Sequence, residues 1–196
     1  LRAFMVRRGV PEQLVGKAWW EVDRALNDQT KDLFDRNKAF YNQLRYGVKV
    51  QPDVGEHKET VWLIDWNNPA NNDFAFAEEV TVAGVYGKRP DIVLYVNGIA
   101  LAVLELKRSV VDVAEGIRQQ ISSQKPEFIE SFFSTVQFVL AGNDVQGVRY
   151  GTIGTPEKYF LNWKDEGGDE PELLDRNLAS LCRKDRLLEL VHDFVA

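Results

Sequence analysis

Apolar residues recur along the chain with two different periods, and these periods separate the expected helices from the expected strands. Spacings of three and four residues predict helices over residues 11–22, 30–44, 111–124, 172–182 and 185–194. Alternating or continuous apolar runs predict strands over residues 48–50, 60–66, 74–82, 91–96, 100–107, 135–141 and 148–153. Pro11 suits a first helical turn and Gly47 a helix end. The composition of residues 165–171 predicts an acidic loop.

These segments follow the order of helices, an antiparallel meander, a helix, a further strand and closing helices. That order predicts an α/β fold whose mixed sheet is flanked by helices. We expect an N-terminal helical segment over residues 1–29, a core over 30–165 and C-terminal helices over 166–196. The chain begins with Leu1 rather than methionine, which suggests either a fragment of a longer protein or a disordered start.

The most informative segment is 89–107, which reads as two apolar strands joined at an Asn-Gly turn. Asp91 opens the first strand, and Glu105 and Lys107 close the second. Placing charged side chains on an apolar hairpin costs free energy unless they are paired or bind an ion. A bound divalent metal is the interpretation that fits this pattern best.

The register of the hairpin decides whether the two acids meet, because side chains alternate between the faces of a strand. A tight two-residue loop pairs Val96 with Ile99. Counting back from that pair, Asp91 lies opposite Leu104 and Glu105 points to the other face. One extra residue, in a longer loop or a bulge, brings Asp91 opposite Glu105. The metal hypothesis therefore requires such an irregularity.

With the acids opposed, their oxygens can share Mg²⁺, which prefers few carboxylates and several waters. The backbone carbonyl of Leu106 is a further candidate ligand. Lys107 would orient the attacking water and stabilise negative charge on the phosphoryl group. The competing interpretation is a solvated Glu105–Lys107 pair on an edge strand, with Asp91 as a turn residue.

The composition of the chain restricts the classes of partner that it can bind. The net charge of −6 excludes a surface that binds polyanions as a whole, so any contact with nucleic acid needs a local basic patch. Candidate phosphate contacts near the hairpin are Lys107, Arg108, Arg118 and Lys125. No apolar run approaches the roughly 20 residues that span a membrane, so we expect no membrane partner.

Three other residue types have structural interpretations. The single cysteine, Cys182, lies on an apolar helical stripe, and one cysteine allows no intrachain disulfide. His57 and His192 are far apart in sequence, so a Cys/His zinc site is not expected. The Trp19-Trp20 pair on the first amphipathic helix is expected in the core, because aromatic pairs there are more often core than interface.

The pair Pro90-Asp91, then thirteen intervening residues, then Glu105-Leu106-Lys107, resembles the PD-(D/E)xK nuclease motif. The surroundings are similar to the N-terminal endonuclease domain of type I restriction enzyme motor subunits. The segments that carry this similarity are 72–74, 89–107, 150–152, 163–164 and 187–194. The resemblance implies a restriction-endonuclease-like fold with Asp91, Glu105 and Lys107 as catalytic residues.

The resemblance further implies cleavage of double-stranded DNA with Mg²⁺, or with Mn²⁺ as a substitute. It implies modification and specificity subunits as partners, in the cytoplasm of a bacterium or archaeon. Cleavage would follow ATP-driven translocation by motor domains that are absent here. The sequence contains no GxxxxGK[ST] phosphate-binding motif, so ATP would be used only in those domains.

The family often carries a QxxxY motif on the helix after the lysine. Gln119 occupies the glutamine position, and Ser123 stands where the family has tyrosine. Gln119 would contact the DNA backbone or support the catalytic strand, and the alternative is an exposed helix glutamine. The family's acid on the first helix is not assigned, and its candidates are Glu21, Asp32 and Asp35.

Two other function classes compete with a nuclease domain of this family. The acidic balance and the Trp19-Trp20 pair favour a non-catalytic docking module with a fortuitous motif. A Holliday-junction or repair nuclease would share the fold, but the residues around the motif match the restriction family better. Metal binding that depends on Asp91 and Glu105 separates the nuclease classes from the docking module.

Overall fold

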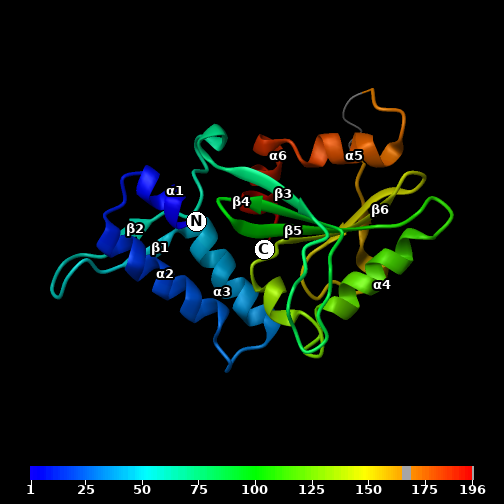
Figure 1. Ribbon diagram of the computed structural model, residues 1–196. Helices are drawn as coiled ribbons and strands as arrows, with labels where there is room; N and C mark the ends of the chain where they lie inside the picture. Colours follow the sequence, from blue (N-terminus) through cyan, green and yellow to red (C-terminus); the bar gives the residue numbers. More distant parts are fainter. Residues whose placement is uncertain (165–168, 196) are drawn as a thin grey trace.

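A computed structural model describes residues 1–164 and 169–195 and has a mixed α/β architecture (Figure 1). Its six-stranded sheet has the order β3-β4-β5-β6-β7-β8. Neighbouring strands are antiparallel except β5 and β6, which run parallel. The strands are β3 (Phe74–Glu78), β4 (Ile92–Val96), β5 (Ile99–Leu106), β6 (Phe138–Asn143), β7 (Gly147–Gly151) and β8 (Leu161–Asn162). The expected α/β fold with a mixed sheet is confirmed.

Helices cover both faces of the large sheet. In Figure 1, α5 and α6 lie along one face and α4 along the other, while α1 to α3 lie at the N-terminal side with a small sheet. The helices are α1 (Arg2–Arg7), α2 (Glu12–Leu26), α3 (Leu33–Tyr46), α4 (Val113–Ser123), α5 (Leu173–Leu181) and α6 (Lys184–Glu189), followed by a π-helical turn (Leu190–Phe194). The small sheet pairs β1 (Val48–Val50) with β2 (Glu59–Val61). Among the described helices, none is long and apolar enough to cross a bilayer.

Strand β5 lies in the middle of the core. Every residue from Ile99 to Glu105 is buried, as expected for a strand covered on both faces. Leu101, Ala102 and Leu104 pack toward the side of α5 and α6. Ala100 and Val103 pack toward α4. Two consecutive residues, Leu101 and Ala102, therefore face the same side, which breaks the normal alternation.

This break is a β-bulge in the β4–β5 hairpin. The turn itself is tight, with Val96 paired to Ile99 and positive φ angles of 52° at Asn97 and 78° at Gly98, as in a type I′ turn. Tyr95 pairs with Ala100, but Leu94 pairs with Ala102, so Leu101 has no partner on β4. The irregularity required by the metal hypothesis is present, as a bulge rather than a longer loop.

Asn97 fixes the closed end of the hairpin through its buried side chain, which is 2% exposed. Its Nδ2 donates to the carbonyl of Leu63 at 2.9 Å and to Oδ1 of Asn72 at 2.8 Å. Its Oδ1 accepts from the backbone N–H of Asp73 at 2.8 Å. One side chain thus ties the turn to the loop that precedes β3.

Two strand predictions extend too far. β2 ends at Val61, and the chain enters a loop in which the Asn72 side chain bonds the backbone of Asp65. Oδ1 of Asn72 accepts from the N–H of Asp65, and its Nδ2 donates to the Asp65 carbonyl. β3 ends at Glu78, because Glu79 adopts a positive φ of 52° that ends the extended conformation. The short helix α1 has no counterpart among the predicted elements.

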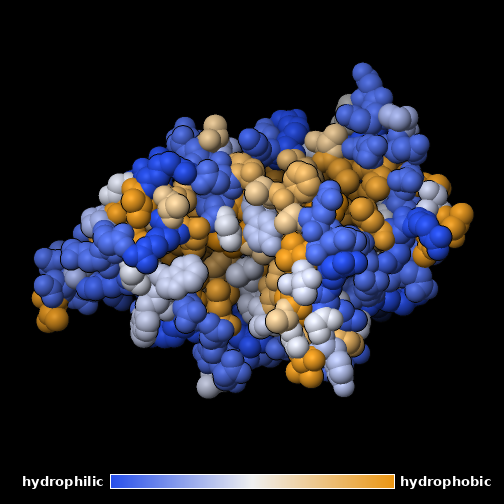
Figure 2. All heavy atoms as spheres, in the orientation of Figure 1, coloured by the Kyte–Doolittle hydropathy of each residue, from blue (hydrophilic) through white to orange (hydrophobic). Residues whose placement is uncertain are grey.

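The prediction that Trp19 and Trp20 are core residues is wrong. They are 52% and 57% exposed, because the buried stripe of α2 consists of Leu14, Val15, Ala18 and Val22. Trp19 instead lines a largely apolar cleft of about 500 Å³ between α2, α3 and the β4–β5 hairpin. Figure 2 shows hydrophobic residues gathered in the middle of this face of the molecule, with hydrophilic residues dominating its left end.

The Asn97 network yields a stability prediction. Asn97→Ala should lower the free energy of unfolding by about 3 kcal/mol, because it leaves buried polar partners unsatisfied and puts a side chain without local hydrogen bonding at positive φ. Urea denaturation followed by circular dichroism measures this loss. Asn97→Gly is the matched control, since it relieves the backbone and isolates the side-chain contribution. Equal stability of Asn97→Ala and wild type would contradict the assignment.

Candidate active site

The bulge brings the two acids of the hairpin to the same side. Beyond it, Val93 pairs with Val103 and Ile92 with Leu104, so the next residues, Asp91 and Glu105, lie opposite each other on the α4 side. Oδ2 of Asp91 accepts a hydrogen bond from the backbone N–H of Leu106 at 2.7 Å. This bond continues the hairpin across its open end and orients the Asp91 carboxylate toward β5.

Lys107 joins this pair. Its Nζ lies 2.7 Å from Oε1 of Glu105 and 2.9 Å from Oε1 of Gln119 on α4. An ammonium has three N–H donors, so one remains after these two bonds. Glu105 is 4% exposed, while the Lys107 side chain is 18% exposed. The lysine thus connects a buried carboxylate with the surface.

Burial raises the pKa of the Glu105 carboxyl above its ordinary value of 4.5. The hydrogen bond from Lys107 opposes this rise, while the charge of Asp91 and a side-chain hydrogen bond with it add to it. Two opposed carboxylates in a buried setting disfavour full ionisation unless a cation compensates them. The site therefore favours a proton or a positive ion beside Glu105.

Gly116 allows α4 to approach this group closely. A Cβ built at this position would lie 3.1 Å from Cβ of Ala141 and 3.5 Å from Cγ of both Glu105 and Lys107. A glycine inside a helix costs about 1 kcal/mol relative to alanine, so the position trades stability for proximity. Gly116 was not among the predicted site residues, although a glycine in the middle of an amphipathic helix is a recognisable signal.

The donor set is suited to a hard divalent cation. The two carboxylates of Asp91 and Glu105 and the backbone carbonyl of Leu106 are oxygen donors, and Mg²⁺ accepts one or two carboxylates with water completing its shell. Within the described residues, no group of three or more His, Cys, Asp or Glu side chains gathers at one point. An ion held by this acidic pair would take the rest of its ligands from water, as hard oxygen-seeking ions do.

The helix positions that correspond to the QxxxY motif make different kinds of hydrogen bond. Gln119 reaches Lys107, while its neighbour Gln120 is buried and its Nε2 donates to the carbonyl of Leu140 at 3.4 Å. Ser123 donates from Oγ to the carbonyl of Gln119 at 2.9 Å. The serine at the expected tyrosine position thus bonds within its own helix, and Gln119 contacts the lysine directly.

The basic candidates lie in different environments. Arg118 on α4 forms ion pairs with Glu115 at 2.9 Å and with Glu157 at 3.2 Å. Arg108 and Lys125 are exposed. Arg118 is thus already compensated by two carboxylates, whereas Arg108 extends the surface next to Lys107.

The acids of the N-terminal helices serve local roles. Glu21 forms an ion pair with Arg24 at 2.5 Å, and Asp32 caps α3 by accepting from the N–H of Asp35 at 2.8 Å. Within the described residues, no hydrogen bond or ion pair joins these acids to Asp91, Glu105 or Lys107.

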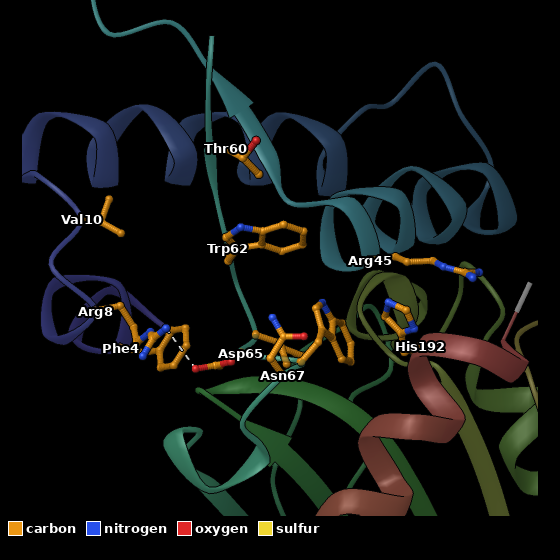
Figure 3. A pocket seen from close by; sticks show the side chains of 11 residues that line it. Phe4, Arg8, Val10, Arg45, Thr60, Trp62, Asp65, Asn67 and His192 are labelled. Atoms are coloured by element: carbon orange, nitrogen blue, oxygen red, sulfur yellow. Dashed lines mark ion pairs between the residues drawn. The ribbon is translucent and has the colours of Figure 1, made fainter.

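A separate cavity of about 480 Å³ lies among the N-terminal helices, the loop after β2 and the C-terminal turn. Figure 3 shows Trp62 at its centre, the Arg8–Asp65 ion pair on one side, and Arg45 and His192 on the other. His192 packs against Trp66 in a tilted arrangement, with ring centroids 4.9 Å apart. The expected structural role of His192 fits this contact, and the cavity is lined by none of the hairpin's charged residues.

The other histidine and the cysteine also lie outside the acidic pair. His57 is exposed on the loop between β1 and β2. Cys182 is half-buried against the core, as predicted, and burial raises its thiol pKa to about 11. A thiol with so high a pKa is a poor nucleophile at neutral pH.

Several known proteins are similar in sequence to this chain. Residues 6–158 match the family described as "Type I restriction enzyme R protein N terminus". The chain is 31% identical to the HindI endonuclease subunit, a type I restriction enzyme subunit of Haemophilus influenzae, over 89% of this chain and 18% of that protein. It is 26% identical to the putative type I restriction enzyme MjaIXP endonuclease subunit of Methanocaldococcus jannaschii, over 86% of this chain and 19% of that protein.

A more distant relative is the SauCOLORF180P endonuclease subunit of Staphylococcus aureus, 24% identical over 68% of this chain and 14% of that protein. The chain thus spans about a fifth of the length of the curated relatives that it matches. The family match covers the hairpin, α4 and the sheet through β7. By that match, the chain belongs to the family of the type I restriction enzyme R protein N terminus.

Proposed function

We propose that this chain is the Mg²⁺-dependent endonuclease domain of a type I restriction enzyme, hydrolysing phosphodiester bonds of double-stranded DNA. The observation that carries the proposal is the convergence of Asp91, Glu105 and Lys107 around one bulged hairpin end. In the longer protein, cleavage would follow ATP-driven translocation by motor domains, together with modification and specificity subunits, in a prokaryotic cytoplasm.

The residues divide the work of hydrolysis. Asp91, Glu105 and the carbonyl of Leu106 would hold the cation, which when bound polarises the phosphoryl oxygen and acidifies a water. Lys107, held by Glu105 and Gln119, directs its remaining N–H toward the attacking water or a phosphoryl oxygen. Its positive charge stabilises the negative charge that develops on the phosphoryl group. Gln119 keeps the ammonium in this position.

Replacing any one of the three charged residues should abolish most of the cleavage. Asp91→Asn, Glu105→Gln and Lys107→Ala should each reduce the cleavage rate by at least about 100-fold, the usual loss for a group that stabilises the transition state. Plasmid linearisation by the full restriction complex measures this. Glu59→Gln and Lys49→Ala, on the small sheet, are the charge-matched controls. Undiminished cleavage by Lys107→Ala would refute its assigned role.

The raised pKa of Glu105 yields a stability prediction with a defined sign. A buried acid with a raised pKa binds more protons in the folded state than in the unfolded state. Ionisation of Glu105 therefore lowers the stability of the fold. This loss is absent below about pH 4.5, the ordinary pKa, and grows as pH rises through the folded pKa. Glu105→Gln keeps a hydrogen-bond acceptor for Lys107 and removes this penalty. The variant should be about 1 kcal/mol more stable than wild type near pH 8, as for other relieved functional groups.

Denaturation with urea at pH 8 and at pH 4 measures this difference, which should vanish at the lower pH. Adding Mg²⁺ at ten times its dissociation constant should stabilise the wild type by about 1.4 kcal/mol and leave Glu105→Gln unchanged. A Glu105→Gln protein that is less stable than wild type at pH 8 would contradict the electrostatic account.

The second candidate function is a docking module of the same assembly, favoured by the exposed Trp19 and Trp20. These side chains lie on α2, and Trp19 borders the apolar cleft. A metal titration separates the two functions, because a docking module would show no Mg²⁺ or Mn²⁺ binding that depends on Asp91 and Glu105.

A further inference from the structure

A basic groove lies at the β8 edge of the sheet, away from the residues assigned to cleavage. Its volume is about 580 Å³, and three of its lining residues are cations, namely Arg149, Lys164 and Arg186. Tyr150, Phe160, Leu161, Asn162 and Trp163 complete the lining, and none of these described lining residues is acidic. The Tyr150 and Trp163 rings pack edge to face at 5.7 Å, and Trp163 donates from Nε1 to Ser180 at 3.2 Å. The aromatic side chains that line the groove beside its positive charges are therefore held in place by packing and a hydrogen bond.

Two of these cations lack the compensation found elsewhere on the surface. In the part of the chain that the structure describes, neither Arg149 nor Lys164 forms an ion pair, and the buried Nε of Arg149 has no hydrogen-bond partner. An unsatisfied buried donor costs roughly 1–3 kcal/mol. Arg118, by contrast, is held by two carboxylates. The charge available for an anionic ligand is thus in the groove rather than on Arg118.

The sheet register relates the groove to the acidic pair. Glu105 pairs with Ala141, and Ala141 pairs with Arg149, so these three side chains lie in one row on the same face. Strands are about 4.8 Å apart, which separates Glu105 and Arg149 by about 10 Å at the backbone. Helix α4 packs over Ala141 between them, since Gly116 approaches that residue. The two sites therefore flank α4.

Both sites open at the same end of the sheet. The N–H of Lys107 donates to Gly142 at 2.9 Å, Gly142 pairs with Val148, and the N–H of Trp163 donates to Val148 at 2.9 Å. Lys107 and Trp163, with Lys164 next to it, are thus level across the strand ends. Three strand spacings place them about 14 Å apart, which corresponds to about four nucleotides at 3.4 Å per nucleotide. A single DNA segment can reach both.

We propose that Arg149 and Lys164 bind backbone phosphates of the DNA whose cleavage is assigned to Asp91, Glu105 and Lys107. The proposal rests on that function for its substrate. Arg149 offers a planar fork for two phosphate oxygens, and Lys164 a mobile point charge at the surface. Contacts to phosphates fix the position of the duplex without reading its sequence. The groove thereby anchors the DNA beside the cutting site.

The test compares two double variants with the same change of charge. Arg149→Gln/Lys164→Ala removes the groove cations, and Arg24→Gln/Lys31→Ala removes one arginine and one lysine from the α2–α3 region. Binding of a fluorescent 30-base-pair duplex, without divalent cation, is measured by anisotropy between 25 and 200 mM salt. The groove variant should bind about tenfold more weakly, with a salt slope smaller by about 1 for each lost contact. The control should match wild type.

Lys164→Ala alone keeps the test independent of folding, because this exposed side chain is not part of the core. It should reduce the slope by about 1 with an unchanged melting temperature. Equal affinities of the groove variant and the control, or no salt-dependent binding by wild type, would overturn the proposal. So would calorimetry in which the groove variant loses inorganic phosphate binding but keeps duplex binding, since the groove would then accept only a small anion.

The same variants separate this proposal from the proposed function. Loss of cleavage in Glu105→Gln with full DNA affinity in the groove variant refutes the groove alone. Weakened DNA binding in the groove variant with undiminished cleavage by Glu105→Gln refutes the assigned catalytic pair and leaves the groove as a DNA contact.

Discussion

The placement of one unpaired residue, Leu101, determines which face of the sheet carries Glu105. On its N-terminal side, Ala100 faces α4, and after the extra residue Val103 faces α4 again. Without the bulge, every residue from 102 onward would change sides, and Glu105 would enter the apolar core beneath α5 and α6. The bulge is therefore required both for a stable core and for the opposition of the two acids. The side chain of the bulge residue, Leu101, also contributes to the core, since it is fully buried.

The charges at the open end of the hairpin are tolerated because a chain of hydrogen bonds compensates them one after another. The N–H of Leu106 bonds Asp91, the ammonium of Lys107 bonds Glu105, and Gln119 bonds the ammonium. Each group satisfies the next, and the last member of the series reaches solvent. The opposite end of the hairpin is closed by neutral hydrogen bonds of Asn97. The closed end of the hairpin is thus held by neutral hydrogen bonds, whereas its open end carries charges that need compensation.

The mixed sheet and most of its elements could be predicted from the sequence, because they depend on the periodicity of apolar residues. The hairpin and the acids at its ends could be identified because they depend on short-range turn chemistry. The Asn-Gly turn and the requirement for an irregularity followed from counting residues, but the choice of a bulge at Leu101 depends on packing on both faces of β5. The exposure of Trp19 and Trp20 was missed because the buried stripe of α2 uses smaller residues. The pairing of Arg118 with Glu157 could not be predicted, because these residues meet only after α4 packs against the 3-10 turn Glu157–Tyr159. Long-range charge pairing cannot be read from local patterns.

Gly116 gives the site a dependence that involves no charge. The helix that carries Gln119 lies so near Ala141 that a Cβ at position 116 would be 3.1 Å from the Ala141 Cβ. A single methyl group there would require α4 or Ala141 to give way by a few tenths of an ångström, while every ionisable group stayed in the protein. The position of the Lys107 ammonium then depends on the clearance between α4 and the sheet, and the uncharged Gly116 keeps that clearance small.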